Sequence, residues 1–331
     1  MGRGNAPSAS GEAEDAGPQL SRRALVLASG AAAVAMPARA VARAEEDLPY
    51  RHRFKSRLVD LGDTRLEVLE AGSGRTTFVC SHPYADASGP FPGGGLTEAL
   101  ASVGRTIYVC PRGTAGSAAE ARRDKLTLSQ LADDMEQVRR KLDIGQWVPV
   151  GTSTGGMTAL QYGVRYPDVI RGLVLVCTAA SYRFLESPDS IYNSANPLNR
   201  NLERLRIATS SGEEWRRAQL AASVYNKSVL PLVERTKRIS VVRADVDREE
   251  VGVNKWDVEP MLKAVRAPTL IVAGRFDAQA GSLIPSFTMA REIVNSELAI
   301  MNRSGHMPYE EEASRFKAVV ADFTRRLDSA T

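Results

Sequence analysis

Short apolar runs alternate with longer segments of helical periodicity along most of this 331-residue chain. The strand-like runs occupy residues 76–80, 106–110, 146–151, 171–177, 268–274 and 296–302. Continuous apolar runs of this length are typical of strands that helices cover on both faces. Between them, Thr127 to Leu142 has apolar residues at steps of three and four, which indicates an amphipathic helix with Thr127 as its N-cap. The alternation predicts an α/β fold built on a mainly parallel sheet.

Two further segments define the predicted organisation of the chain. Residues 51–61 and 64–72 alternate apolar and polar side chains, so an antiparallel pair should bring the sheet to eight strands. Residues 181–267 are rich in charge, include helix-like stretches and are too long for a plain loop. We expect a helical cap there, lying over the end of a core made of residues 45–180 and 268–331.

The first 44 residues have the pattern of an export signal rather than of a folded domain. An arginine pair at 22–23 precedes a weakly apolar stretch, residues 24–36, which is too short to span a bilayer. Small residues follow and offer cleavage after Ala40 or Ala44. The arginine pair resembles the twin-arginine export signal of bacteria. We therefore expect residues 1–44 to be a signal peptide and the protein to be periplasmic or extracellular.

Charge and composition restrict the partners that the chain can have. Its net charge is +4 without a lysine- or arginine-rich block, so nucleic acid is not expected. No long apolar surface run suggests stable membrane association, and no P-loop or G-x-G-x-x-G in a strand–helix context implies a nucleotide. Cys80, Cys110 and Cys177 end apolar runs and are interpreted as core thiols, with a Cys80–Cys110 disulfide as the alternative. We expect a small-molecule substrate, no cofactor and no metal, and the oligomeric state stays open.

Small residues crowd the junction between the strand at 146–151 and the helix that follows it. Residues 151–155, Gly-Thr-Ser-Thr-Gly, match the G-x-S-x-G pattern in the strand–turn–helix context that this pattern requires. In such a turn the glycines permit close packing, the serine backbone is strained, and the hydroxyl projects beside a helix N-terminus. Ser153 is therefore the candidate nucleophile.

A serine hydroxyl needs a general base, and the chain has three histidines to supply one. His52 lies near the start of the expected mature chain, and His82 follows the third predicted strand. His306 lies after the last predicted strand and before the last helix, at the same edge of the sheet as the Ser153 turn. His306 is therefore the candidate base.

The base in turn needs a carboxylate that fixes its tautomer and stabilises the imidazolium. Asp277 is the candidate, because it follows a predicted buried strand and lies between the serine and the histidine in chain order. Glu310, Glu311 and Glu312 are the nearest competitors in sequence. We interpret these three as a solvated start to the last helix, where acidic side chains complement the helix dipole.

The serine turn, the aspartate and the Gly-His before the last helix together resemble the α/β-hydrolase superfamily over about residues 50–330. Residues 112–117, Arg-Gly-Thr-Ala-Gly-Ser, are similar to the family's Arg-Gly-x-Gly-x-Ser loop with one extra residue. The resemblance implies an α/β-hydrolase fold, with an eight-stranded, mostly parallel sheet, helices on both faces and a helical cap. Among relatives, the chain looks most like enol-lactonase-like esterases and proline-iminopeptidase-like enzymes. The Cys80-Ser81 pair departs from the His-Gly that is common in the third-strand loop.

Two backbone N–H groups are expected to bind the oxyanion that forms on the substrate. One is that of Thr154, directly after the nucleophile. The other should come from the third-strand loop, where Pro83 has no N–H to offer. His82 is the candidate there, because many members of the family place the donor just before a proline, and Tyr84 is the alternative.

The resemblance implies a serine hydrolase that cleaves a small ester, lactone, thioester or amide through an acyl-enzyme. Acyltransferases, cofactor-free haloperoxidases and lyases use the same site on this fold and are the alternatives, and a non-catalytic binding protein is a further one. Trp215, Tyr225 and Trp256 are candidates to line a substrate pocket, although packing in the interior is the commoner role of such side chains.

Overall fold

A computed structural model describes residues 1–2, 54–82, 94–118, 120, 122–208, 213–238 and 251–330. Both expected cleavage positions of the signal peptide, and Tyr84 in the third-strand loop, lie outside the described residues. Export of the protein therefore stays a prediction. Among the helices of the described part of the chain, none has the length and apolar character needed to span a bilayer.

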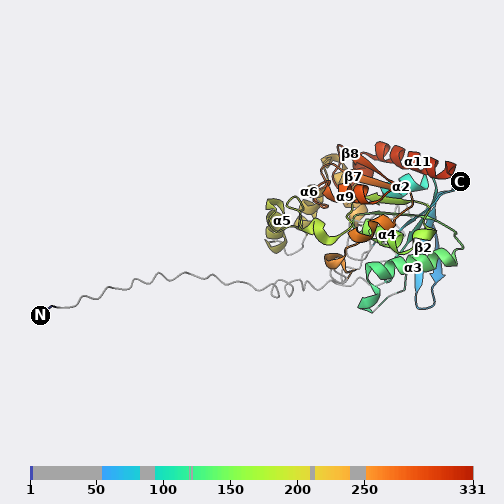
Figure 1. The fold of residues 1–331 in the computed structure, drawn as a ribbon, viewed down its shortest axis with the longest axis horizontal. Coiled ribbons are helices and arrows are strands. Elements are labelled where there is room, and N and C mark those ends of the chain that lie inside the picture. Colours follow the sequence, from blue (N-terminus) through green and yellow to red (C-terminus); the bar gives the residue numbers. More distant parts are fainter. Residues whose placement is uncertain are drawn as a thin grey trace. The chain divides into compact units, whose positions relative to one another are not determined.

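An eight-stranded sheet forms the centre of the fold (Figure 1). Its strands are β1 (Lys55–Asp60), β2 (Arg65–Ala71), β3 (Thr77–Cys80), β4 (Arg105–Val109), β5 (Val148–Thr152), β6 (Leu173–Val176), β7 (Thr269–Gly274) and β8 (Ser296–Met301). They lie side by side in the order β1-β2-β4-β3-β5-β6-β7-β8. Both pairings of β2 are antiparallel, and the other pairings are parallel. The predicted fold class is confirmed, including the antiparallel pair at the edge.

Helices cover both faces of the sheet, which explains the continuous apolar runs. They are α2 (Gly95–Ala101), α3 (Leu128–Lys141), α4 (Thr154–Arg165), α9 (Ile284–Glu292), α10 (Pro308–Glu311) and α11 (Ala313–Ser329), with 3-10 turns η2 (Arg123–Lys125) and η3 (Pro167–Val169). Because strand side chains alternate between faces, Val174 and Val176 pack with residues of α2 and α11. Leu173 and Leu175 point the other way and pack with residues of α4 and α9. Figure 1 shows α3 and α4 on one side of the sheet and α11 and α2 on the other.

All the regular elements that the structure describes between β6 and β7 are α-helices or 3-10 helices. Its elements are η4 (Tyr182–Leu185), α5 (Pro197–Ala208), α6 (Glu213–Ser223), η5 (Lys227–Val229), α7 (Leu230–Arg238), η6 (Val253–Lys255) and η7 (Glu259–Ala264). Apart from a single bridge between Ser181 and Asp257, the described residues of this segment form no sheet pairing. The two helix-like stretches of the sequence in this segment are residues 201–208 and 213–225. Helix α5 contains the first, and α6 covers the second as far as Ser223. The limits of a separate cap at 181–267 stay a prediction.

Two local predictions from the sequence are confirmed. The side chain of Thr127 caps α3, because its Oγ1 accepts a hydrogen bond from the N–H of Gln130 at 3.2 Å. Cys80, Cys110 and Cys177 are all buried and form no disulfide, so the thiols belong to the core and Cys80 is not joined to Cys110.

Candidate active site

Ser153 occupies the turn between β5 and α4, in a strained backbone conformation. Its φ is 53° and its ψ is −129°, in the left-handed half of conformational space that a residue with a side chain rarely adopts. The turn is so tight that a Cβ on Gly151 would lie 2.0 Å from the carbonyl oxygen of Gly155. A Cβ on Gly156 would lie 2.6 Å from the side chain of Thr178. The glycines around Ser153 are therefore needed for the turn, as the pattern in the sequence indicates.

Asp277 and His306 form a buried pair at the ends of two neighbouring strands. Asp277 follows β7 and His306 follows β8, and their side chains are 3% and 2% exposed. Nδ1 of His306 lies 2.8 Å from Oδ1 and 2.9 Å from Oδ2 of Asp277. The backbone N–H groups of Gln279 and Ala280 also donate to Oδ1, at 2.9 and 3.1 Å. These bonds hold the carboxylate on Nδ1 and direct the other ring nitrogen, Nε2, away from it.

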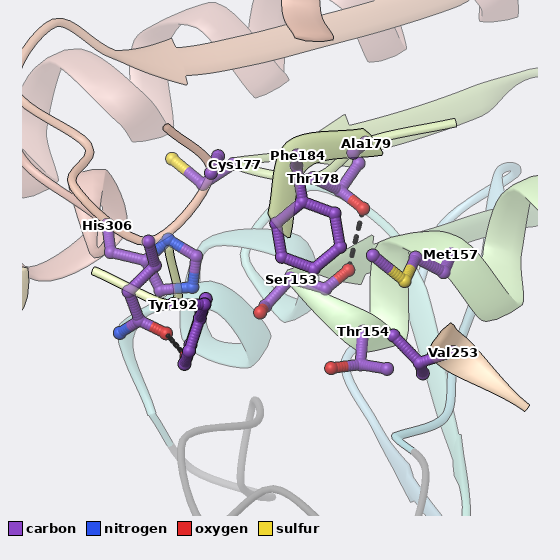
Figure 2. A pocket seen from close by; sticks show the side chains of 12 residues that line it. Ser153, Thr154, Met157, Cys177, Thr178, Ala179, Phe184, Tyr192, Val253 and His306 are labelled. Atoms are coloured by element: carbon purple, nitrogen blue, oxygen red, sulfur yellow. Dashed lines mark hydrogen bonds between the residues drawn. The ribbon is translucent and has the colours of Figure 1, made fainter. Parts of the chain in front are cut away.

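The structure brings Ser153 to the same place as this pair. Ser153 and His306 line one pocket, and Figure 2 shows the Ser153 hydroxyl pointing toward the imidazole. Nε2 of His306 is buried and has no hydrogen-bond partner among the described residues. The carbonyl oxygen of Ser153 accepts a hydrogen bond from Thr178 at 2.7 Å, which ties the serine turn to the end of β6. All three residues that the sequence singles out as nucleophile, base and acid thus lie together.

The pocket beside Ser153 is small, and its walls are mainly apolar. It is lined by Ser153, Thr154, Met157, Cys177, Thr178, Ala179, Phe184, Tyr192, Val253, Gln279, Ala280 and His306 (Figure 2). On its polar side, the Tyr192 hydroxyl donates to Oε1 of Gln279 at 2.7 Å. Nε2 of Gln279 donates in turn to Oγ of Ser223 at 2.6 Å. The pocket therefore offers apolar walls and one hydrogen-bonded polar edge.

Trp215, Tyr225 and Trp256 are not among the residues that line this pocket, and for Trp256 the commoner role, packing in the interior, is confirmed. Trp256 is buried against the core, and its Nε1–H donates to Gln161 at 2.8 Å. Tyr225 stacks on Phe276 with ring centroids 4.4 Å apart and is half exposed. Trp215 lies on α6 and is not among the lining residues. Phe184 and Tyr192 supply the aromatic lining instead, and no pattern around them in the sequence marks them.

The third-strand loop reaches the start of α4, where the oxyanion donors are expected. A Cβ on Gly155 would lie 3.0 Å from the carbonyl oxygen of Ser81 and 3.1 Å from the ring of His82, so His82 packs against the first turn of the helix. His82 is buried at 6% exposure, and Thr154 is the first residue of α4. The N–H of Thr154 therefore belongs to the helix N-terminus, where backbone donors are free to bind an anion. Tyr84 lies outside the described residues, so the choice between His82 and Tyr84 stays a prediction.

The interpretation of a solvated helix start at Glu310, Glu311 and Glu312 is wrong. All three side chains are partly buried, and each accepts hydrogen bonds from backbone N–H groups. Burial raises the pKa of Glu310 and of Glu311. The sequence misses this role because an acidic residue in a first helical turn has the same pattern whether its carboxylate faces solvent or a neighbouring loop.

Cys177, at the end of β6, adds a thiol to the Asp277–His306 pair. The three side chains offer possible metal-ligand atoms within 4.8 Å of one another. Burial, and then the charge of Asp277, raise the pKa of the Cys177 thiol well above its ordinary value. The sulfur lies 3.4 Å from the N–H nitrogen of Gly274 and 3.7 Å from the carbonyl oxygen of Gly305. A metal ion would need the thiolate and would have to break the Asp277–His306 bonds, so the geometry favours the hydrogen-bonded pair.

Comparison with known proteins identifies the family of this chain. The family model described as alpha/beta hydrolase fold matches residues 76–313. A 2-hydroxymuconate semialdehyde hydrolase from a Pseudomonas species is 30% identical over 57% of this chain, and the match spans 65% of that relative, just under two thirds of its length. A proline iminopeptidase from Thermoplasma volcanium is 22% identical over 70% of this chain and 83% of the relative.

Solved structures show the same fold. A hydrolase from Bacillus anthracis superposes with a TM-score of 0.72 at 24% identity, covering 82% of this chain and 99% of its own. An esterase from Exiguobacterium antarcticum gives a TM-score of 0.64 at 20% identity, covering 82% of this chain and 100% of its own. The family model matches more than half of the chain and includes Ser153, Asp277 and His306. This chain therefore belongs to the α/β-hydrolase family of enzymes.

Proposed function

We propose that this protein is a serine hydrolase that cleaves a small-molecule ester, lactone, thioester or amide through an acyl-enzyme intermediate. The observation that carries the proposal is the bonding of both Asp277 carboxylate oxygens to Nδ1 of His306, at 2.8 and 2.9 Å. That bonding assigns the Nδ1–H tautomer and makes Nε2 the basic nitrogen. Nε2 is buried in the pocket that holds the Ser153 hydroxyl, which is where a general base is needed.

The reaction begins with attack by the Ser153 hydroxyl on the substrate carbonyl, while Nε2 of His306 takes the hydroxyl proton. Asp277 stabilises the imidazolium that forms, and the protonated Nε2 then gives its proton to the leaving group as the carbonyl–heteroatom bond breaks. Water attacks the resulting acyl-enzyme by the reverse sequence of proton transfers, which releases the acid and restores Ser153. His306 and Asp277 are thus used twice, once in each half of the reaction.

The oxyanion on the tetrahedral intermediates is bound in this proposal by the N–H groups of Thr154 and His82. Support comes from the packing of His82 against Gly155 at the start of α4, which places both residues at the same helix N-terminus. Donors in such a position stabilise charge that develops in the transition state, and each contributes about 100- to 1,000-fold in rate.

The walls of the pocket favour an apolar acyl group of modest size. Met157, Phe184 and Val253 form the apolar side, and the small size of the pocket limits the acyl group that it accommodates. Tyr192 and Gln279 form the polar edge beside His306, where a leaving group with a hydrogen-bonding atom is accommodated best. The similar proteins named above include an esterase and a proline iminopeptidase, so ester and amide substrates both belong in the test.

Turnover of a substrate panel tests the proposal. The panel consists of p-nitrophenyl esters of increasing chain length, lactones and aminoacyl-nitroanilides. The Ser153→Ala variant should lose about 10⁴- to 10⁶-fold in kcat while its thermal unfolding stays unchanged, because the nucleophile is removed and the fold is not. Ser129→Ala, at an exposed serine near the start of α3, is the matched control and should keep the wild-type rate.

The other outcomes separate the alternatives. A Ser153→Ala variant with wild-type turnover would overturn the proposal. Serine-dependent transfer of the acyl group to an added alcohol, in preference to water, would make the protein an acyltransferase with the same nucleophile. A wild-type protein that binds panel members without turning any of them over, and whose Ser153 does not react with a fluorophosphonate, would be a binding protein.

A further inference from the structure

Four backbone N–H groups converge on the carboxylate of Glu311. Oε1 accepts from the N–H of Gly305 at 2.9 Å and from that of Met307 at 3.3 Å. Oε2 accepts from the N–H of Tyr225 at 2.6 Å and from that of Asn226 at 2.9 Å. One side chain thereby satisfies donors from two segments that lie about 80 residues apart in the chain.

The first of these segments is the loop that carries His306. Gly305 and Met307 are its immediate neighbours, so Oε1 holds the backbone on both sides of the histidine. The imidazole ring of His306 moves with its backbone. Because Oε1 holds the N–H groups on both sides of His306, it fixes the position of the Cα from which the ring extends toward Ser153. The bond from Asp277 then sets the rotation of the ring about that position.

The second segment follows α6 and belongs to the helical chain between β6 and β7. It touches the histidine loop directly, because the N–H of His306 donates to the carbonyl oxygen of Ser223 at 2.7 Å. The fit is close: a Cβ on Gly305 would lie 2.4 Å from that same carbonyl oxygen. Tyr225 and Asn226 come next, and their N–H groups bind Oε2 of Glu311. Glu311 therefore fastens the end of α6 to the histidine loop.

The same end of α6 also supports the acid. Oγ of Ser223 accepts the hydrogen bond from the side-chain amide of Gln279 at 2.6 Å, and the backbone N–H of Gln279 donates to Asp277. Displacement of the α6 end would thus disturb both the backbone of His306 and the turn of Asp277. Glu311 does not line the pocket beside Ser153, so any influence it has on the reaction passes through these contacts.

From these contacts, and resting on the proposed function, we infer that Glu311 is a positioning residue for His306, which locks the histidine loop against the end of α6. Its carboxylate is suited to this because two oxygens, each accepting two hydrogen bonds, can serve two segments at once. A buried carboxylate is costly unless it is fully hydrogen-bonded, and the four N–H groups supply that compensation. A carboxamide in its place has only one acceptor oxygen. Its NH₂ group would face the backbone N–H groups of the other segment, so donor would meet donor and those hydrogen bonds would be lost.

The test compares Glu311→Gln with Glu310→Gln in the full-length protein. Glu310 is the matched control, because it is the adjacent residue, is also partly buried and binds a backbone N–H, that of Gly95 at 2.8 Å, rather than the histidine loop. We expect Glu311→Gln to lower kcat and the rate of fluorophosphonate labelling of Ser153 about 10- to 100-fold, with KM within about 2-fold of wild type. Glu310→Gln should keep kcat and the labelling rate within about 2-fold of wild type. It should nevertheless shift the melting temperature by about as much as Glu311→Gln does.

A second variant guards against a loss of folding in the first. Glu311→Asp keeps the negative charge on a side chain that is one methylene shorter. The shorter carboxylate cannot bind the N–H groups of both segments, so this variant should also be labelled more slowly. Wild-type labelling rates in either folded variant would overturn the inference, as would failure of both to unfold cooperatively, since Glu311 would then be a folding residue. Equal losses in the Glu310 and Glu311 variants would overturn it too. Failure of the wild-type protein itself to be labelled would instead count against the proposed function.

Discussion

At the scale of single residues, position in the chain carries most of the information about this site. Ser153, Asp277 and His306 each follow a predicted strand, so sequence alone indicates that they share one edge of the sheet. The two oxygen contacts of Asp277 with Nδ1, by contrast, depend on rotamers and on the N–H groups of Gln279 and Ala280, which no pattern reveals. Tyr192 is likewise unmarked, because it joins the pocket only through the path of the chain between β6 and β7.

Asp277→Asn should lower kcat by about 10⁴-fold with little change in stability, because an amide holds the imidazole in the wrong tautomer for proton abstraction. Steady-state kinetics and thermal unfolding of the purified variant measure both quantities. Asp168→Asn, at an exposed aspartate in η3, serves as the control and should leave kcat unchanged. Retention of more than a tenth of the wild-type kcat by Asp277→Asn would move the role of the acid to another residue.

At the scale of elements, the junction of β5 and α4 shows how a local pattern specifies a local structure. The sequence predicts both the strand and the helix, and the glycines on either side of Ser153 predict the tight turn between them. Prediction fails at the end of α10, where the register of the helix decides that Glu311 faces the histidine loop. Amphipathic patterning reports which face of a helix is apolar, but it does not report which backbone N–H groups a neighbouring loop presents.

Gly151→Ala should destabilise the protein by about 3 kcal/mol and abolish activity, because the added Cβ would lie 2.0 Å from the backbone oxygen of Gly155. Gly163→Ala is the matched control inside α4. Its Cβ would meet only side chains at 3.5 Å or more, so the substitution should be neutral or stabilise by about 0.4–1 kcal/mol. Urea denaturation of the two variants measures the difference, and equal stabilities would contradict the packing described for the turn.

At the scale of the whole molecule, the sheet positions the residues of the candidate site, and the helices stabilise the sheet. The parallel strands from β3 to β8 end at one edge, so β5, β7 and β8 bring Ser153 together with Asp277 and His306, which lie more than 100 positions later in the chain. Stability depends on contacts between helices as well. Glu136 on α3 accepts hydrogen bonds from Tyr162 on α4 at 2.6 Å and from Arg139 and Arg140 on its own helix. Neither the tyrosine nor its partner is marked in the sequence, since the pairing depends on how α3 and α4 cross.

The pH dependence of stability should reflect Glu136. Burial alone would raise its pKa, but the hydrogen bonds from Arg139, Tyr162 and Arg140 outweigh that effect and lower the pKa from 4.5 to about 2. A carboxyl whose pKa is lower in the folded state adds stability above the unfolded value, near 4.5, and this contribution is lost as the pH falls toward 2.

Glu136→Gln should therefore lower the free energy of unfolding by about 1–3 kcal/mol at pH 7, and the difference from wild type should shrink between pH 5 and pH 2. Urea denaturation at several pH values measures it. Glu186→Gln, at an exposed glutamate, is the control and should show a difference close to zero throughout. A Glu136→Gln deficit that stays constant down to pH 2 would show that the charge of the carboxylate is not its source.

The covalent reaction of Ser153 with a fluorophosphonate, followed by intact-protein mass and peptide mapping, tests the central claim most directly. The account predicts one adduct per chain, on the peptide that contains Ser153, with no adduct on Ser153→Ala and much slower formation on His306→Ala. A folded wild-type protein that forms no adduct, or a Ser153→Ala variant that is labelled as fast as wild type, would contradict the assignment of Ser153 as a nucleophile activated by His306.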